Sequence, residues 1–323
     1  MTKKIKVAAV IPCFNGGGIT IKIIKETFKF VDTVVLVDDC CPYRTGKLAE
    51  KEIKNKNLII LFNENNLGVG GSTKKAFKYL LNTDHEIIIK IDADGQMDPN
   101  EIPKLIKPIK NGEADVTKGN RFINIEKLSV MPKLRLFGNI CISFLAKAST
   151  GYWELFDPTN GFLAFQINIL EKINIDKIDN KFFFETDLLF RFGLANAFIV
   201  EVPTKVIYNN QISNLVPLEQ VRYFGYKLFV CFIKRIFYQY FLFEINIGTI
   251  QLILTFLLTL FALAWNSYAI ISGIILNKLS SSGTTAISVI LTISALQFML
   301  AFINYDVSQR LIIKRLRVIK RNT

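Results

Sequence analysis

The sequence predicts an α/β protein in which a mostly parallel sheet is flanked by helices and followed by a membrane-spanning helical hairpin. Two observations predict this class. Four short apolar runs rich in β-branched residues alternate with helical stretches in the N-terminal part, and two long uncharged runs occupy the C-terminal part. Because the N-terminal runs are continuously apolar, we expect the sheet to be buried on both faces.

The first four strands and their helices can be placed by pattern. The strand-like runs are residues 6–11, 33–38, 57–62 and 86–92, and the helical stretches are 19–30, 44–55, 69–82 and 99–110. Strands that alternate with helices are typical of a parallel sheet, which binds its ligands at the carboxyl ends of the strands. The functional residues are therefore expected where these strands end.

Polar residues and glycines follow all four strand ends. Any one of these ends could be a turn or a helix cap, but four at one edge of a sheet predict a ligand site. In chain order the candidates are Pro12 and Asn15, then Asp38 and Asp39, then Gly68 and Gly71, then Asp92, Asp94 and Gln96.

The glycines at residues 68–71 do not complete a known phosphate-binding motif. Thr73 stands where a dinucleotide fingerprint requires its third glycine, and no P-loop can be aligned. Hydride transfer and Walker-type ATP hydrolysis therefore lose their main support.

The stretch Asp92-Ala-Asp94-Gly-Gln96 is a candidate metal site. In an extended strand end, Asp92 and Asp94 share one face, and Gln96 joins them if the strand breaks at Gly95. Hard oxygen ligands suit Mg²⁺ or Mn²⁺, which would also offset the carboxylate repulsion. A glycosidase-type acid pair is disfavoured, because two residues of one strand cannot flank a bond from opposite sides. Asp98, before Pro99, is expected to cap the next helix.

Two uncharged runs, 245–277 and 279–305, are each long enough to cross a bilayer. We predict spans at about 247–273 and 284–305, with buried core helices as the alternative. Lys and Arg residues precede the first span and follow the second, so the positive-inside rule places the N-terminal domain in the cytoplasm. The prediction is a multi-pass protein of the cytoplasmic membrane.

The sequence divides into four parts by these patterns. Residues 1–212 form the α/β domain, 213–245 interfacial amphipathic helices, 246–306 the transmembrane hairpin and 307–323 a basic cytoplasmic tail. Segments 129–149 and 221–243 mix aromatic residues with Lys and Arg, as membrane-interface helices do. Packing against the sheet is the alternative for both segments.

Composition excludes several functions. The net charge is +13, but many basic residues lie beside a membrane span, where anionic lipid is the nearer partner, and no nucleic-acid-binding motif is present. The five cysteines lack zinc-site spacing, and a single histidine, His85, rules out a histidine cluster. Nucleic acid is therefore not an expected partner.

Seven motifs together resemble a known family. They are VIPCFN, LVDD, NLGVGGSTKKA, IDADGQMDP, KGNR (118–121), DPTNGF (157–162) and FFFETDLLFRF (182–192). In these motifs the chain resembles the inverting family 2 glycosyltransferases of GT-A fold. Within that family it is similar to the membrane-attached polyprenyl-phosphate sugar synthases of the dolichyl-phosphate mannose synthase and bactoprenyl glucosyltransferase groups. The resemblance covers residues 6 to about 208 by motif, and the hairpin extends it over most of the chain.

The resemblance implies a UDP- or GDP-sugar donor and a polyprenyl phosphate acceptor in the membrane. It implies that Asp38 and Asp39 hold the base and ribose, and that Asp92, Asp94 and Gln96 hold Mg²⁺ or Mn²⁺ on the diphosphate. Pro12, Asn15, Gly68 and Gly71 lie at the same nucleotide-sugar rim. It implies that Arg121 reaches the diphosphate or the acceptor phosphate, and it makes Asp157, Glu185 and Asp187 candidates for orienting the acceptor. The alternatives are a turn or cap residue before Pro158 for Asp157 and a solvated helix face for Glu185 and Asp187.

Two departures and two rival functions stay open. A Gly-Gly-Gly run follows Asn15, and DDCC replaces the common DDGS, which leaves the nucleotide undecided. A processive polysaccharide synthase generally carries a Q-x-x-R-W motif and more spans, neither of which is visible. A non-catalytic nucleotide-sugar-binding membrane subunit would have little need of the D-x-D motif and Arg121. The sugar and the oligomeric state, a homo-oligomer included, are not specified.

Overall fold

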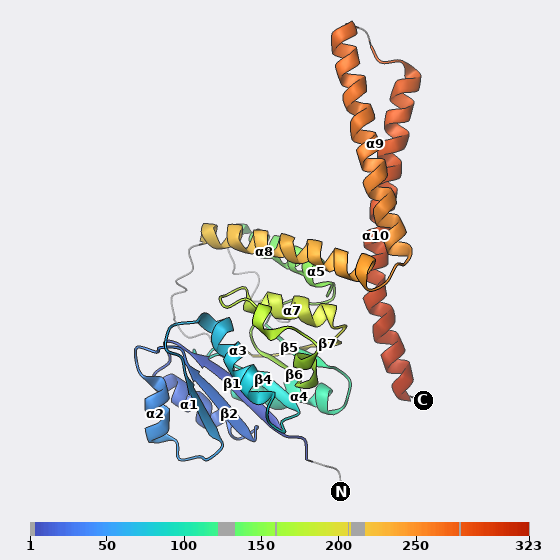
Figure 1. Cartoon of the computed structure of the whole chain (residues 1–323). Coiled ribbons are helices and arrows are strands. Elements are labelled where there is room, and N and C mark those ends of the chain that lie inside the picture. Colours follow the sequence, from blue (N-terminus) through green and yellow to red (C-terminus); the bar gives the residue numbers. More distant parts are fainter. Residues whose placement is uncertain are drawn as a thin grey trace. The chain divides into compact units, whose positions relative to one another are not determined.

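The computed structural model describes residues 4–121, 133–158, 160–205, 207, 217–277 and 279–322. The chain divides into two compact units, Met1–Ile233 and Lys234–Thr323. Each unit is described by itself below, and Figure 1 labels most of their helices and strands.

The first unit is built on a seven-stranded sheet in the order β3-β2-β1-β4-β6-β5-β7. β6 is antiparallel to both of its neighbours, and the other adjacent pairs are parallel. The predicted mostly parallel sheet is thus confirmed. The strands are β1 (Val7–Cys13), β2 (Thr33–Asp38), β3 (Leu58–Phe62), β4 (Ile87–Lys90), β5 (Val116–Asn120), β6 (Leu163–Gln166) and β7 (Ile199–Pro203).

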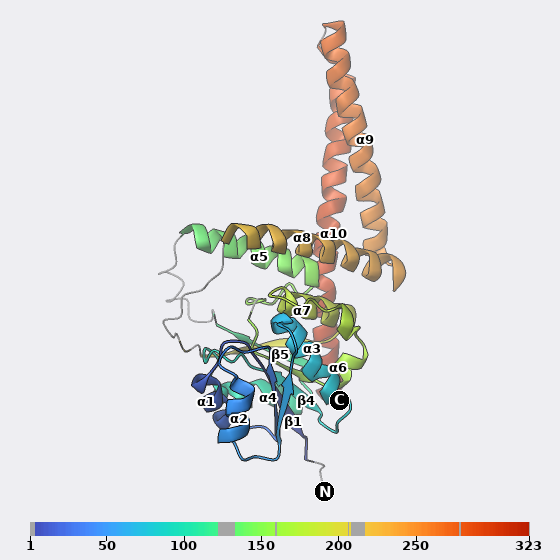
Figure 2. The same ribbon diagram turned by 60° about the vertical axis from the view of Figure 1, so that its left-hand side comes forward.

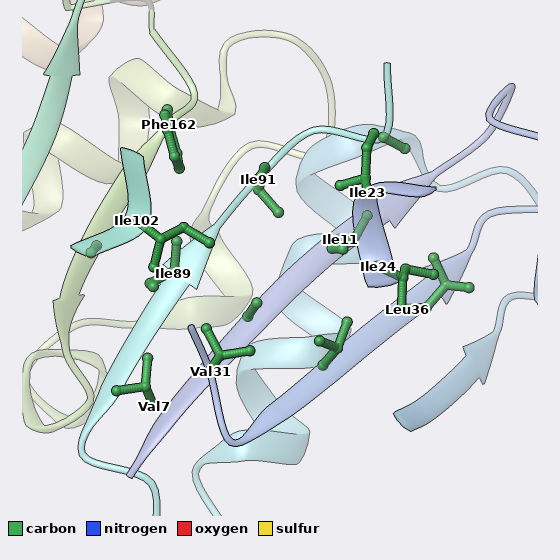
Figure 3. Packing of buried hydrophobic residues seen from close by; sticks show 14 of the residues in the cluster. Val7, Ile11, Ile23, Ile24, Val31, Leu36, Ile89, Ile91, Ile102 and Phe162 are labelled. Carbon is green, nitrogen blue, oxygen red and sulfur yellow. The ribbon is translucent and has the colours of Figure 1, made fainter. Parts of the chain in front are cut away.

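Helices cover both faces of this sheet. Side chains of β1 alternate between two buried clusters, Ala9 and Ile11 in one and Ala8 and Val10 in the other. The first cluster is closed by α1 (Gly18–Thr27), α2 (Thr45–Glu52) and α4 (Ile102–Lys110), and Figure 3 shows part of its packing. The second is closed by α3 (Gly68–Leu80), α6 (Asn168–Glu171) and α7 (Phe184–Leu194).

Among the boundaries that differ from the sequence prediction, two lie close to the predicted metal site. The helix expected at 99–110 begins as a 3-10 turn, Pro99–Glu101, before α4. The Asp98 side chain accepts a hydrogen bond from the Asn100 backbone N–H at 2.9 Å, which confirms the expected cap. The fourth strand ends at Lys90 and not at residue 92.

Two further helices, α5 (Lys133–Thr150) and α8 (Pro217–Phe237), pack together beside α7 (Figure 2). Leu228 and Cys231 of α8 join Phe183 and Phe190 in a third buried cluster, and the Ser149 hydroxyl donates to the Leu228 carbonyl at 2.8 Å. Other α8 side chains, such as those of Tyr226 and Phe229, are exposed. One face of α8 therefore packs as a core helix, while another face is free for an interface.

The second unit is a helical hairpin of α9 (Ile247–Leu276) and α10 (Ser282–Asn322). Its segments Ile247–Ile275 and Ser282–Gln309 are long and apolar enough to cross a membrane. α9 begins at a capping box in which Asn246 and Thr249 bond each other's backbone N–H groups. Before it, a π-helical turn (Tyr238–Leu242) follows α8. These two apolar segments agree with the predicted spans to within a few residues, whereas the helix α10 continues beyond the second span to Asn322.

Candidate active site

A pocket of about 100 Å³ opens where β4, β5 and β7 end. Five of the sequence-predicted site residues line it, namely Asp92, Asp94, Gln96, Arg121 and Glu185. The remaining lining residues are Met97, Asn160, Gly161, Phe162, Thr204 and Lys205. The strand order explains this meeting, because β6 and β5 bring residues far apart in the chain beside the end of β4.

Asp92 to Gln96 form a turn, here called the D-x-D turn (residues 92–96), and not a strand end. This corrects the expectation that Asp92 and Asp94 share a strand face. Gly95 has φ +77, which few other residues adopt, and the Asp94 carboxylate accepts the Gln96 backbone N–H at 2.9 Å. The Ile207 N–H also donates to the Gln96 carbonyl at 3.0 Å. The turn is therefore held both by a hydrogen bond within it and by one from residue 207.

The oxygen atoms of the D-x-D turn fit a divalent cation. Within the described ranges there is no group of three or more His, Cys, Asp or Glu side chains that could hold a metal ion alone. Two carboxylates and an amide instead suit Mg²⁺ or Mn²⁺, which retain positions for water and phosphate oxygens. Burial raises the pKa of Asp94, and the neighbouring charge of Asp92 adds to this effect, so a bound cation would offset part of the repulsion between the two carboxylates.

Lys90, which the sequence reasoning missed, lies fully buried directly beside this turn. Its ammonium is 2.5 Å from Asp92 Oδ1 and 3.1 Å from Glu185 Oε1. Burial alone would lower the pKa of Lys90, but the two carboxylates outweigh it and raise that pKa. A charged residue at the end of the apolar run IIIK was the available signal for this role.

Gly161 leaves room above this charged group. A side chain there would clash with the Lys90 ammonium and would place its Cβ 3.0 Å from Asp92 Oδ2 and 3.1 Å from Glu185 Oε1. Glycine at this position therefore keeps the carboxylates accessible from the pocket.

Arg121 and Asp157 form a forked ion pair next to the pocket. Arg121 Nε donates to Asp157 Oδ2 at 2.7 Å and Nη2 donates to Oδ1 at 2.9 Å, while the Asp157 side chain is fully buried. Glu201 of β7 holds the same loop by accepting the backbone N–H groups of Phe156 and Asp157, at 2.7 and 2.9 Å. The sequence singled out Arg121 and Asp157 as separate candidates, but it predicted neither their pairing nor the role of Glu201, which depends on β7 lying beside β5.

Asp187 does not join these residues. It lies two positions after Glu185 on α7, so the two side chains point to different sides of the helix. Its carboxylate pairs with Arg191 at 3.1 Å and accepts the Asp179 N–H at 2.7 Å. Burial raises the pKa of Asp187.

Lys118 is a second buried lysine that sequence reasoning did not place in the site. It donates to the Asn160 carbonyl, next to Gly161. Burial lowers the pKa of Lys118 to about 8, although Asp157 and Glu185 act in the opposite direction.

Asp38 and Asp39 are buried at the end of β2 and organise two loops. Asp38 accepts the Cys41 and Gly46 N–H groups, both at 2.7 Å, and Asp39 accepts those of Leu67 and Gly68, both at 2.8 Å. Of the other predicted rim residues, Pro12 is buried in β1 and Asn15 is exposed just after it.

Gly68 and Gly71 have a packing role at the start of α3. Gly68 has φ +79, and a Cβ there would lie 2.6 Å from the Asn180 carbonyl. A Cβ at Gly71 would lie 2.6 Å from Leu67 Cβ. The N–H groups of Gly70 and Gly71 both bond the Asn180 carbonyl, at 2.9 and 3.1 Å. Close packing on Asn180 for Gly68, and on Leu67 for Gly71, is thus one reason for these glycines, and their role at the nucleotide-sugar rim stays a prediction.

The sequence model of the protein family 'Glycosyl transferase family 2' matches residues 8–173, and the chain belongs to this family. It is 27% identical over 203 residues to an undecaprenyl-phosphate mannosyltransferase of Micrococcus luteus, a match that covers 61% of this chain and 82% of that protein. It is 28% identical over 191 residues to a UDP-N-acetylglucosamine–dolichyl-phosphate N-acetylglucosaminyltransferase of Methanococcus voltae, which covers 55% and 75% of the two chains.

A solved structure has the same fold. The glucosyl-3-phosphoglycerate synthase of Mycobacterium tuberculosis, in complex with Mn²⁺, UDP and glucosyl-3-phosphoglycerate, superposes with a TM-score of 0.51. The match covers 71% of this chain and 79% of that one at 16% identity, so it supports the fold alone.

Proposed function

We propose that this protein transfers a sugar from a nucleoside-diphosphate sugar to a polyprenyl phosphate, with inversion at the anomeric carbon. The observation that carries the proposal concerns the three carboxylates expected to serve the acceptor. Asp157 is paired with Arg121, Glu185 with Lys90 and Asp187 with Arg191. Carboxylates held by cations are poorly suited to take a proton from a hydroxyl acceptor. A phosphate monoester is already an anion and needs no such base.

The donor side of the proposal rests on the D-x-D turn. Asp92, Asp94 and Gln96 would hold Mg²⁺ or Mn²⁺, which when bound stabilises the negative charge of the departing diphosphate. Arg121 and Lys205 add positive charge to the same pocket. With Asp157 fixing its Nε and Nη2 atoms, Arg121 presents its guanidinium in one orientation, as phosphate recognition requires.

The acceptor side is supported by the relatives and the hairpin. The names of both curated relatives state a polyprenyl-type phosphate acceptor. Two helices of this chain are apolar enough to anchor it in the membrane that holds such lipids. The basic residues on either side of the two spans favour a cytoplasmic position for the first unit.

A transfer assay on the purified full chain tests this function. The protein in detergent is incubated with radiolabelled UDP- and GDP-sugars, Mg²⁺ or Mn²⁺, and undecaprenyl or dolichyl phosphate. We expect label in a lipid-extractable product that mild acid releases, and no product with the matched alcohol that lacks the phosphate. Label in polymer would instead indicate a processive synthase, and absence of transfer from every donor would indicate a non-catalytic subunit.

A further inference from the structure

Lys90 occupies an unusual place for a charged residue. It ends β4, a central strand paired with β1 on one side and β6 on the other, and its side chain has no solvent exposure. An ammonium buried in this way is costly unless carboxylates compensate it. Its two partners, Asp92 and Glu185, come from the D-x-D turn and from α7, elements far apart in the sequence.

The contact between Lys90 and Asp92 involves only one of the two carboxylate oxygens of Asp92. Oδ1 is held by Lys90, while Oδ2 lies beside Gly161, where the missing side chain leaves the pocket open. A carboxylate fixed through one oxygen presents the other in a single orientation. Replacing a residue that holds a metal ligand in this way typically weakens metal binding about 10- to 100-fold.

The charges around Lys90 point in the same direction. Asp92, Asp94 and Glu185 line the pocket as three carboxylates, and Lys90 supplies one positive charge to two of them. Arg121 and Lys205 also line this pocket, but the guanidinium of Arg121 is paired with Asp157. Lys90, in contrast, is in direct contact with a carboxylate of the D-x-D turn.

We propose that Lys90 is a positioning residue of the cation site, which orients Asp92 for the divalent ion and ties the D-x-D turn to α7 through Glu185. This inference rests on the proposed function, because it takes Asp92 to be a ligand of that ion. It assigns Lys90 no contact with substrate, so the residue acts through Asp92 and Glu185.

The test measures Mn²⁺ binding by electron paramagnetic resonance on the full chain in detergent, with Mn²⁺ alone and with UDP or GDP added. We expect Lys90→Met to weaken Mn²⁺ binding at least about tenfold. Lys104→Met is the matched control, because Lys104 is also paired with a buried carboxylate, that of Glu101, but lies on α4. We expect the control to bind Mn²⁺ as the wild type does.

Folding is checked by circular dichroism and thermal unfolding without metal. If Lys90→Met fails to fold, the double variant Lys90→Met/Glu185→Gln is used, because it removes one charge of each sign. We expect the double variant to fold and to bind Mn²⁺ at least about tenfold more weakly than the wild type. A folded single or double variant that binds Mn²⁺ within about twofold of wild type overturns the role of Lys90. A wild type that binds no Mn²⁺ under any of these conditions overturns the cation site, and this inference with it.

Discussion

At the scale of single residues, the role of Asp157 is defined by the charged side chain that it contacts, that of Arg121. From sequence, Asp157 could be a turn residue before Pro158 or a group that orients the acceptor. In the structure its fully buried carboxylate holds both Nε and Nη2 of Arg121. Removing only one partner of such a pair leaves a buried charge uncompensated, so Asp157 is expected to fix Arg121 at the wall of the pocket.

Asp94 offers a test in which activity and stability change in opposite directions. We expect Asp94→Asn to lower sugar transfer at least about 100-fold, because it removes a charge that holds the cation. In metal-free buffer we expect the same variant to unfold at a higher temperature than wild type. It removes a partly buried charge that Asp92 repels. Transfer assays and thermal unfolding in EDTA measure the two effects.

Asp98→Asn is the matched control for that variant. Asp98 caps the turn at Pro99–Glu101, and asparagine caps almost as well as aspartate. We therefore expect this control to retain transfer. Near-wild-type transfer by Asp94→Asn would contradict the assignment of Asp94 to the cation site.

At the scale of elements, the start of α3 is fitted to the segment 179–184. The glycines at 68–71 were expected at the nucleotide-sugar rim, and that role remains a prediction. The structure gives them a second reason, since Gly68 and Gly70 approach the backbone of residues 179 and 180. Glycine spacing at a helix start serves close packing as well as phosphate contact, and sequence alone does not separate the two.

Gly70→Ala tests this packing. A Cβ at Gly70 would overlap the Asp179 carbonyl and lie 2.9 Å from Phe184 Cβ, so backbone must move to admit it. We expect a loss of about 1–3 kcal/mol in the free energy of unfolding, measured with urea on the full chain. Gly18→Ala, at the first residue of α1, meets nothing within 4 Å and should cost nothing. Equal stability of the two variants would contradict this, because it would show that the backbone at the start of α3 can move to admit the methyl group at no cost.

Strands β1 to β4 could be predicted from the sequence, because each is a continuous apolar run that is bounded by turn residues. It singled out KGNR, DPTNGF and ETD but could not place them around one pocket. That placement depends on β6 entering antiparallel between β4 and β5, a pairing of strands distant in the chain. Lys118 and Glu201 were missed for the same reason, because their partners lie on other elements, as does Glu185, the second partner of Lys90.

At the scale of the whole molecule, α8 belongs mainly to the first unit. The sequence-based boundary lies at residue 212, whereas the compact units divide after Ile233. Leu228 and Cys231 are buried against Phe183 and Phe190, so α8 completes a cluster of the sheet-containing unit. Periodicity detected the aromatic and basic character of α8 but not which of its faces is covered.

The second unit is stabilised by a buried ion pair of its own, whose first residue lies just after that boundary. Arg235 forms a forked pair with Asp306 of α10 at 2.7 and 2.9 Å, and the Tyr240 hydroxyl donates to the same carboxylate at 2.6 Å. All three side chains are almost fully buried. A buried pair of this kind holds the residues that precede the hairpin to α10.

Two truncations test where the first unit ends. A fragment of residues 1–233 retains all three buried clusters of that unit, whereas a fragment of residues 1–212 loses Leu228 and Cys231 and uncovers Phe183 and Phe190. We expect the longer fragment to unfold cooperatively in urea. The shorter one should be less stable by a few kcal/mol, about the cost of uncovering two large apolar side chains. Equal unfolding midpoints and slopes for the two fragments would show that α8 does not stabilise the unit, and would support the predicted boundary at residue 212.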